Sequence, residues 1–242
     1  MPPNELYQFS VVSALMDGVA STGVPLRQVL AHGSHGLGTF RSMRGELIAL
    51  DGECWQMRHD GSVRAADLTE GSPTEDFSPF AMVTDFAAEA STRAAISAKD
   101  GVEGVLARLA PNANNTHVAF RIDGAFKAIT VRTAQGQCFP GEGLKDVASR
   151  QVTVTLPASR GTVVGFRSPQ FLQGVAVAGV HMHYIDEGRT AGGHVLALES
   201  DGEVEVQVAE LWRTVMDLPR GDAAFNAAPL ALNDGGIKAV EG

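Results

Sequence analysis

Alternating hydrophobic and polar positions run through most of the second half of the chain. In His117–Val131, Val118, Phe120 and Ile122 alternate before an Asp-Gly pair at 123–124, and Phe126 with apolar neighbours follows the pair. In Gly193–Leu211, Val204, Val206 and Val208 alternate after a second such pair at 201–202. Alternation with period two is typical of β-strands, and Asp-Gly between two such runs favours a hairpin turn. The pattern therefore predicts antiparallel strands with hairpins at both pairs.

Helical spacing is confined mainly to the first half. Apolar residues recur every three or four positions in Glu5–Ala20, which predicts a helix there. A second helix is expected from Pro25 to Gly33, and a third over Val102–Ala110, which ends before a proline. We expect an α+β fold with mixed or antiparallel sheet, few helices and a β-barrel-like C-terminal part. Its expected domains are residues 1–110, with α+β structure, and 111–242, rich in strands and carrying a metal site.

The amino-acid composition excludes several classes of function. The chain has 242 residues, is 44% hydrophobic and carries a formal net charge of −9. This hydrophobic content supports a folded core, while the acidic balance argues against nucleic-acid and anionic-membrane partners. No apolar run reaches the roughly 20 residues of a membrane helix, so a cytoplasmic location is expected. The two cysteines, Cys54 and Cys138, are expected to be free thiols.

The sharpest chemical signal is a group of three histidines. His181 and His183 are two positions apart in an apolar run, and His194 opens the next predicted strand after a turn. Residues i and i+2 of a strand share one face. If the two strands pair, the three imidazoles converge and suit a divalent transition metal, most often zinc. The alternative is that the three histidines make unrelated hydrogen bonds.

Two other functions use a similar pattern. A cupin-like metal oxygenase or isomerase also has His-x-His on a strand with a nearby glutamate, here Glu187, but its last histidine normally comes much later in the chain. A non-catalytic metal-binding β module would use the histidines alone. That module would leave other polar candidates without a role.

Three of these candidates lie outside the histidine segment. The segment HGSHGLGTF (32–40) is rich in glycine, which allows close approach of a backbone to a ligand. Glu46 begins an apolar strand, either as an exposed first position or as a site carboxylate. Arg132 ends a strand, where it would hold a substrate carboxylate or form a surface ion pair.

Taken in order, these segments make the chain resemble the α-acetolactate decarboxylases, zinc enzymes that form acetoin from 2-acetolactate. The resemblance runs from LYQFSVVSALMDGV through HGSHGLGTF, GELIALDGE, SPFAMVTDF, FRIDGAF, VRTAQGQ and GTVVGFRSP to GVHMHYIDEGRTAGGHVL. It implies two domains and a homodimer in which the sheet extends between subunits. It also implies functional residues: zinc ligands His181, His183 and His194, and active-site residues Thr39, Glu46, Arg132 and the tail residue Glu241.

The chemistry of 2-acetolactate fits such a site. Loss of carbon dioxide from this β-keto acid leaves an enediolate, and zinc would stabilise the negative charge as it develops. A thiamine or pyridoxal cofactor is therefore not required. Arg132 suits the departing carboxylate, and Glu46 or Glu241 suits delivery of the proton that completes acetoin.

Overall fold

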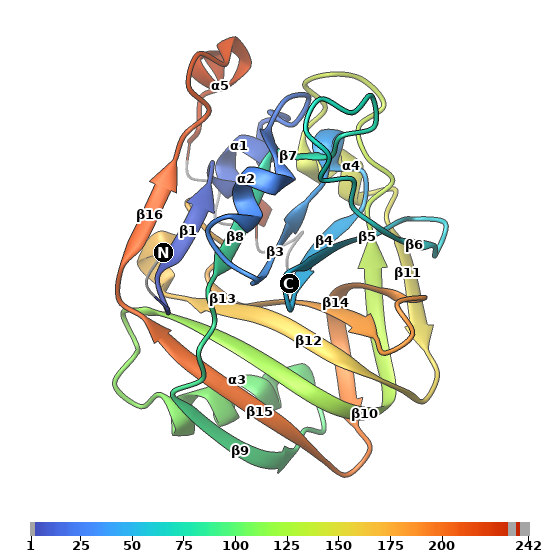
Figure 1. Cartoon of the computed structure of the whole chain (residues 1–242), viewed down its shortest axis with the longest axis vertical. Coiled ribbons are helices and arrows are strands. Elements are labelled where there is room, and N and C mark those ends of the chain that lie inside the picture. The colour runs from blue at the N-terminus through green and yellow to red at the C-terminus, as the bar shows by residue number, and fades with distance from the viewer. Residues whose placement is uncertain (1–2, 232–235, 238–242) are drawn as a thin grey trace.

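The computed structural model describes residues 3–231 and 236–237. Two β-sheets pack against each other, one in the upper half of Figure 1 and one in the lower half. Short helices lie around these layers. The expectation of a strand-rich α+β fold with few helices is confirmed.

The first sheet has seven strands in the order β16-β1-β8-β3-β4-β5-β6. All neighbours are antiparallel except β1 and β16, which run parallel. A separate two-stranded ribbon joins β2 and β7. The bounds are β1 (Leu6–Phe9), β2 (Val24–Pro25), β3 (His35–Thr39), β4 (Glu46–Leu50), β5 (Glu53–Met57), β6 (Val63–Ala65), β7 (Phe77–Ser78), β8 (Phe80–Thr84) and β16 (Thr214–Asp217).

The second sheet is built around one long strand. The first half of β10 pairs with both β12 and β15, and its second half pairs with β11 and β14. Because β13 pairs with β12 and with β14, strands β10, β12, β13 and β14 close on themselves, as a barrel-like sheet. The bounds are β9 (Ala90–Ala95), β10 (His117–Thr133), β11 (Val152–Leu156), β12 (Ser159–Ser168), β13 (Gly179–Asp186), β14 (Gly192–Ser200) and β15 (Glu203–Leu211).

The described residues contain five α-helices, of which three begin before residue 110. Helices α2 and α3 confirm two of the predicted helices. None of the helices in the described ranges is long and apolar enough to span a membrane. The bounds are α1 (Val12–Met16), α2 (Leu26–Leu30), α3 (Lys99–Leu109), α4 (Leu144–Ala148) and α5 (Ala223–Ala227), with short 3₁₀ turns at Arg41–Met43 and Gln170–Leu172.

Strand alternation divides the core between the layers. On β4, Leu47 packs with α2 in one cluster, whereas Ile48 and Leu50 pack with Ile185 of β13 in another. Successive side chains of a strand point to opposite faces, so one strand serves both clusters. The face of β4 that carries Ile48 therefore faces the second sheet.

Three local predictions are wrong. Leu6–Phe9, predicted as helix, is strand β1, held between β8 and β16. The Asp-Gly pair at 123–124 makes no turn, because β10 continues through it. The pair at 201–202 does not form a hairpin either, because β14 and β15 both run antiparallel to β10 and pair one after the other with its residues 126–132 and 117–123.

The division at residue 110 into two domains stays a prediction. Strands from both halves of the chain contribute to each sheet: β9 joins the second sheet and β16 joins the first. Both cysteines are free thiols, as expected.

Candidate metal centre

The three histidines meet because two antiparallel strands place them opposite each other. His183 of β13 lies directly across from His194 of β14. Along β13, Met182 and Tyr184 point into the barrel core, so the alternate residues His181 and His183 point out of it. Their face is the one that packs on the first sheet.

The geometry suits a metal ion with nitrogen ligands. One ring nitrogen from each of His181, His183 and His194 lies within 4.8 Å of the others. All three side chains are buried, with exposed fractions of 8%, 1% and 2%. Zinc accepts three imidazoles at about 2.0–2.1 Å and leaves further positions for water or substrate. The donor set therefore fits the expected group, and it also fits other transition metals that prefer imidazole.

A backbone carbonyl orients one of the rings. His183 Nδ1 lies 2.7 Å from the carbonyl oxygen of Leu47 on β4. This nitrogen donates to the carbonyl, which leaves Nε2 as the ligating atom. The contact also joins the two sheets at the site.

Burial keeps the imidazoles in the form that binds metals. Desolvation, helped by the positive charges of Arg132 and Lys99, lowers the pKa of His181 to about 3. The same causes, with the neighbouring histidines, hold the pKa of His194 well below 6.5. Neutral imidazole has a free lone pair for a metal, so both rings are ready to ligate at neutral pH.

Glu46 and Thr39 approach the histidines from the first sheet. They are direct partners in the β3–β4 ladder. Glu46 shares the face of Ile48 by alternation, and its Oε2 lies 3.6 Å from His183 Nε2. Thr39 Oγ1 donates to the carbonyl oxygen of Gly45 at 2.9 Å. Its hydroxyl proton is thereby engaged, which leaves the oxygen as an acceptor.

Arg132 completes the polar set from the second sheet. It lies opposite His194 in the β10–β14 register and is only 5% exposed. Its Nη1 donates to Gln151 Oε1 at 3.0 Å. Sequence reasoning missed Gln151, because a lone glutamine between α4 and β11 carries no pattern that points to a site.

These side chains share one small cavity of about 50 Å³. One water needs about 10–15 Å³ on this scale, so the cavity suits a small molecule. Thr39, Glu46, Arg132, His181 and His183 all line it. Its apolar wall, which the sequence pattern did not indicate, is formed by Val12, Leu15, Met43, Phe80, Leu144 and Val177.

One candidate carboxylate does not join the described group, and a second cannot be placed relative to it. Glu187, the residue that a cupin-like site would use, has a side chain 77% exposed and lies near Arg160. It is not among the residues that converge with the histidines. Glu241 lies outside the described residues.

Known proteins resemble this chain along nearly its whole length. The family model described as alpha-acetolactate decarboxylase matches residues 6–232. The alpha-acetolactate decarboxylase of Klebsiella aerogenes is 36% identical, covering 99% of this chain and 90% of the relative. That of Methanosarcina mazei is 37% identical, over 92% of this chain and 75% of the relative. A crystal structure of alpha-acetolactate decarboxylase from Bacillus subtilis strain 168 superimposes with a TM-score of 0.90 at 32% identity, covering 98% of this chain and 99% of that one.

Proposed function

The chain belongs to the alpha-acetolactate decarboxylase family and is a carboxy-lyase, and from this premise we propose that it converts 2-acetolactate to acetoin with a zinc ion held by His181, His183 and His194. The observation that carries the proposal is the convergence of three buried imidazoles, two of which line one small cavity together with a carboxylate and a guanidinium. Bound zinc supplies Lewis-acid stabilisation of the negative charge that develops on the substrate oxygens.

Arg132 binds and orients the carboxylate that leaves. A guanidinium stays charged at neutral pH and matches a carboxylate with two parallel donors. Gln151 accepts a hydrogen bond from Nη1 and so helps to hold in place the guanidinium that lines the cavity. Decarboxylation breaks the bond between the carboxylate carbon and the adjacent carbon, and the electron pair moves toward the ketone oxygen.

Glu46 moves the proton that completes the product. Its carboxyl group lies beside the histidines and lines the cavity, within reach of a bound substrate. It delivers a proton to the carbon that has lost carbon dioxide, which gives acetoin. Thr39 accepts a hydrogen bond from the substrate hydroxyl, since its own proton is engaged by Gly45.

Membership of this family argues against the two alternative functions inferred from the sequence. A cupin-like oxygenase or isomerase lacks its glutamate, because Glu187 is exposed at the surface. A non-catalytic module would leave the buried Arg132 and the cavity unexplained.

Three finer expectations remain part of the proposal. The homodimer with sheet extension rests on the family resemblance, and light scattering of the purified chain would test it. The cytoplasmic location is consistent with two free thiols, and cell fractionation would test it. The role of Glu241 at the metal rests on the resemblance alone, and a Glu241→Gln variant assayed for turnover would test it.

The decisive experiment measures acetoin from racemic 2-acetolactate. Purified protein should form acetoin well above the spontaneous rate, a chelator should abolish the reaction, and added zinc should restore it. Iron or manganese with a dependence on oxygen would instead favour the cupin-like chemistry. A zinc-loaded protein without any acceleration would overturn the proposal.

A further inference from the structure

A second and larger hollow, of about 650 Å³, adjoins the β3–β4 connection. Four arginines line it, Arg41, Arg44, Arg58 and Arg64, and we call it the arginine hollow. Positive residues gather here although the whole chain carries a net charge of −9. The candidate metal centre uses none of these four side chains.

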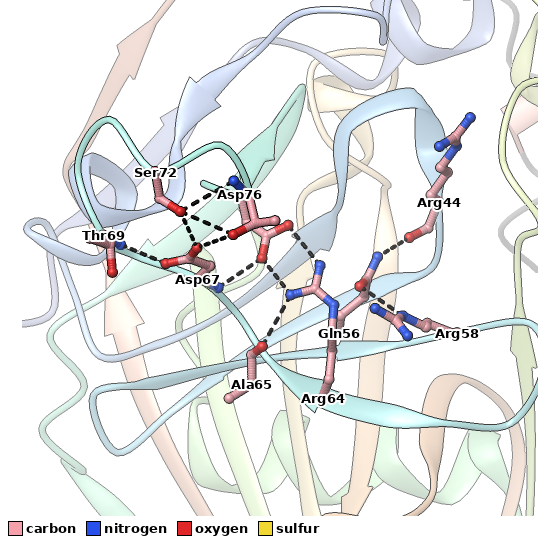
Figure 2. Close-up of polar contacts among 10 residues, drawn as sticks. Arg44, Gln56, Arg58, Arg64, Ala65, Asp67, Thr69, Ser72 and Asp76 are labelled. Carbon is pink, nitrogen blue, oxygen red and sulfur yellow. Dashed lines mark hydrogen bonds and ion pairs between the residues drawn. The ribbon is translucent and has the colours of Figure 1, made fainter.

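The acidic side chains of the hollow are already engaged. Asp76 accepts two bonds from Arg64, at 2.6 and 2.7 Å, and one from the backbone N–H of Asp67 (Figure 2). Glu75 accepts from Arg27 at 3.1 Å. Arg64 is therefore neutralised within the protein, and neither carboxylate is available to the other arginines.

The remaining charges leave the hollow positive. Arg41, Arg44 and Arg58 form no ion pair in the part of the chain that the structure describes. Asp60 accepts two bonds from Ser62 and is the one further carboxylate of the lining. Four arginines against Asp60, Glu75 and Asp76 give the lining one net positive charge at neutral pH.

Neighbouring side chains hold the guanidinium groups of Arg41 and Arg58 and the backbone of Arg44 in place. The Arg41 guanidinium carbon lies 5.2 Å from the ring centroid of Phe77. Arg58 Nε donates to Gln56 Oε1 at 3.1 Å, and Gln56 Nε2 donates to the carbonyl oxygen of Arg44 at 2.6 Å (Figure 2). Groups that are already oriented lose less freedom when a ligand binds.

We propose that the arginine hollow binds a small polyvalent anion, of phosphate or polycarboxylate chemistry, and that the bound anion changes turnover at the histidine site. Guanidinium groups match the oxygens of both ligand types, and the three arginines that form no ion pair among the described residues suit a ligand with several anionic oxygens. The volume limits the ligand to a small molecule.

The β3–β4 connection provides the route between the two sites. Thr39, Met43 and Glu46 line the catalytic cavity, whereas Arg41 and Arg44 of the same segment line the hollow. Hydrogen bonds tie the segment to the residues that follow β10: Gly45 donates to the carbonyl of Ala134, and Gln137 donates to that of Ser42. A ligand that binds Arg41 and Arg44 thus changes the position of the backbone segment that carries Thr39 and Glu46.

Binding is tested without turnover, by calorimetric titration of the zinc-loaded full chain at low salt. Inorganic phosphate and propane-1,2,3-tricarboxylate are the two probes, and the one that binds identifies the ligand chemistry. The variant Arg44→Gln with Arg58→Gln should weaken binding at least about tenfold, because it removes two charged donors. Both positions are at least partly exposed, so the variant should keep the melting temperature of the parent.

Arg160→Gln is the matched control. It removes one positive charge from a different hollow, of about 470 Å³, whose lining includes Asp123, Glu203 and Glu205. Binding should be unchanged in this variant. Absence of millimolar binding by both probes, or equal binding by parent and double variant, would overturn the site, and the latter result would place the anion elsewhere, as at Arg132.

The effect on turnover rests on the proposed function and is measured separately. Saturating anion should change kcat/KM for 2-acetolactate at least about fivefold, and the double variant should lose this response while keeping its basal rate. An equal response in both proteins would mean competition at the catalytic cavity and would refute the coupling. Absence of any acetoin formation would refute the proposed function, while the titration would still decide whether the hollow binds anions.

Discussion

At the residue scale, strand alternation selects which side chains reach the site. His181 and His183 share one face of β13, and the residues between and after them fill the barrel core. The same rule turns Glu46 toward the second sheet, since it shares a face with Ile48 and Leu50. A substitution at one of these positions therefore tests a chemical role with little effect on the opposite face.

His183→Ala should lose both metal and activity. It removes one of three imidazole ligands, so zinc affinity should fall at least about 100-fold. Metal content by mass spectrometry, together with acetoin formation, checks this. The exposed His59, changed to alanine, provides the control and should keep one zinc per chain. Full zinc occupancy of His183→Ala would exclude this residue as a ligand.

Glu46→Gln should separate metal binding from proton transfer. The amide keeps the shape of the side chain but cannot deliver a proton, so kcat should fall by about 100-fold or more. Zinc content should stay at the parental level, because the three histidines are intact. Near-normal kcat in the zinc-loaded variant would remove Glu46 from the mechanism.

Gln151→Ala should act through Arg132. Loss of the 3.0 Å bond frees the guanidinium to rotate, and substrate carboxylate binding should weaken. A bond to a charged group contributes about 1.5–3 kcal/mol, so KM should rise at least about tenfold, with a smaller change in kcat. Lys145→Ala, at an exposed position of α4, should change neither constant. A fall in kcat with KM unaltered would contradict a positioning role.

How far the site was predictable depends on how local its signals are. The convergence of the histidines follows from spacing along two adjacent strands, and the β13–β14 register confirms it. The closeness of Glu46 to His183 depends on the packing of two sheets, so spacing alone does not reveal it. Its expected role came instead from resemblance to a family. For Gln151, neither the spacing along a strand nor the family resemblance indicated a role.

At the element scale, the wrong predictions share one cause, which is pairing between distant segments. Leu6–Phe9 has helical spacing, yet it pairs with residues 214–217 at the other end of the chain. Gly124 does not serve a turn; a Cβ there would lie 2.5 Å from a methyl carbon of Val204, so glycine permits close packing against β15. The pairing of β13 with β14, which are neighbours along the chain, was predictable from the sequence. Pairing between strands that are distant along the chain was not.

Two glycine substitutions should have opposite effects on stability. A Cβ on Gly38 of β3 would lie 2.3 Å from the carbonyl oxygen of Phe80, so Gly38→Ala should lower the free energy of unfolding by about 1–3 kcal/mol. Gly104 in α3 is exposed, with its nearest neighbour 4.0 Å away, and Gly104→Ala should raise it by about 0.5–1 kcal/mol. Denaturant titration measures both, and a stabilised Gly38→Ala would show that β3 and β8 can move apart.

At the scale of the whole molecule, the site exists because two sheets are held together around it. His183 bonds to Leu47 across the layers on one side. On another, His35 of β3 lies 3.1 Å from the carbonyl oxygen of Phe120 on β10, stacked on Phe86. Disturbing the contact of His35 should therefore weaken the layer packing on which the catalytic cavity depends.

Acidification should provide this disturbance through His35. Burial lowers its pKa from 6.5 to about 4 in the folded protein, while the unfolded chain takes up the proton near pH 6.5. Below pH 6.5 the unfolded state thus binds more protons, and stability should fall down to about pH 4, by about 1–3 kcal/mol from this group. His117, with a pKa also lowered to about 4, adds to the same trend. His35→Gln keeps a donor but no titratable group, so its stability should fall less steeply over this range than that of the parent, whereas the exposed His59→Gln should match the parent. Equal slopes for His35→Gln and the parent would show that protonation of His35 does not limit the association of the two sheets.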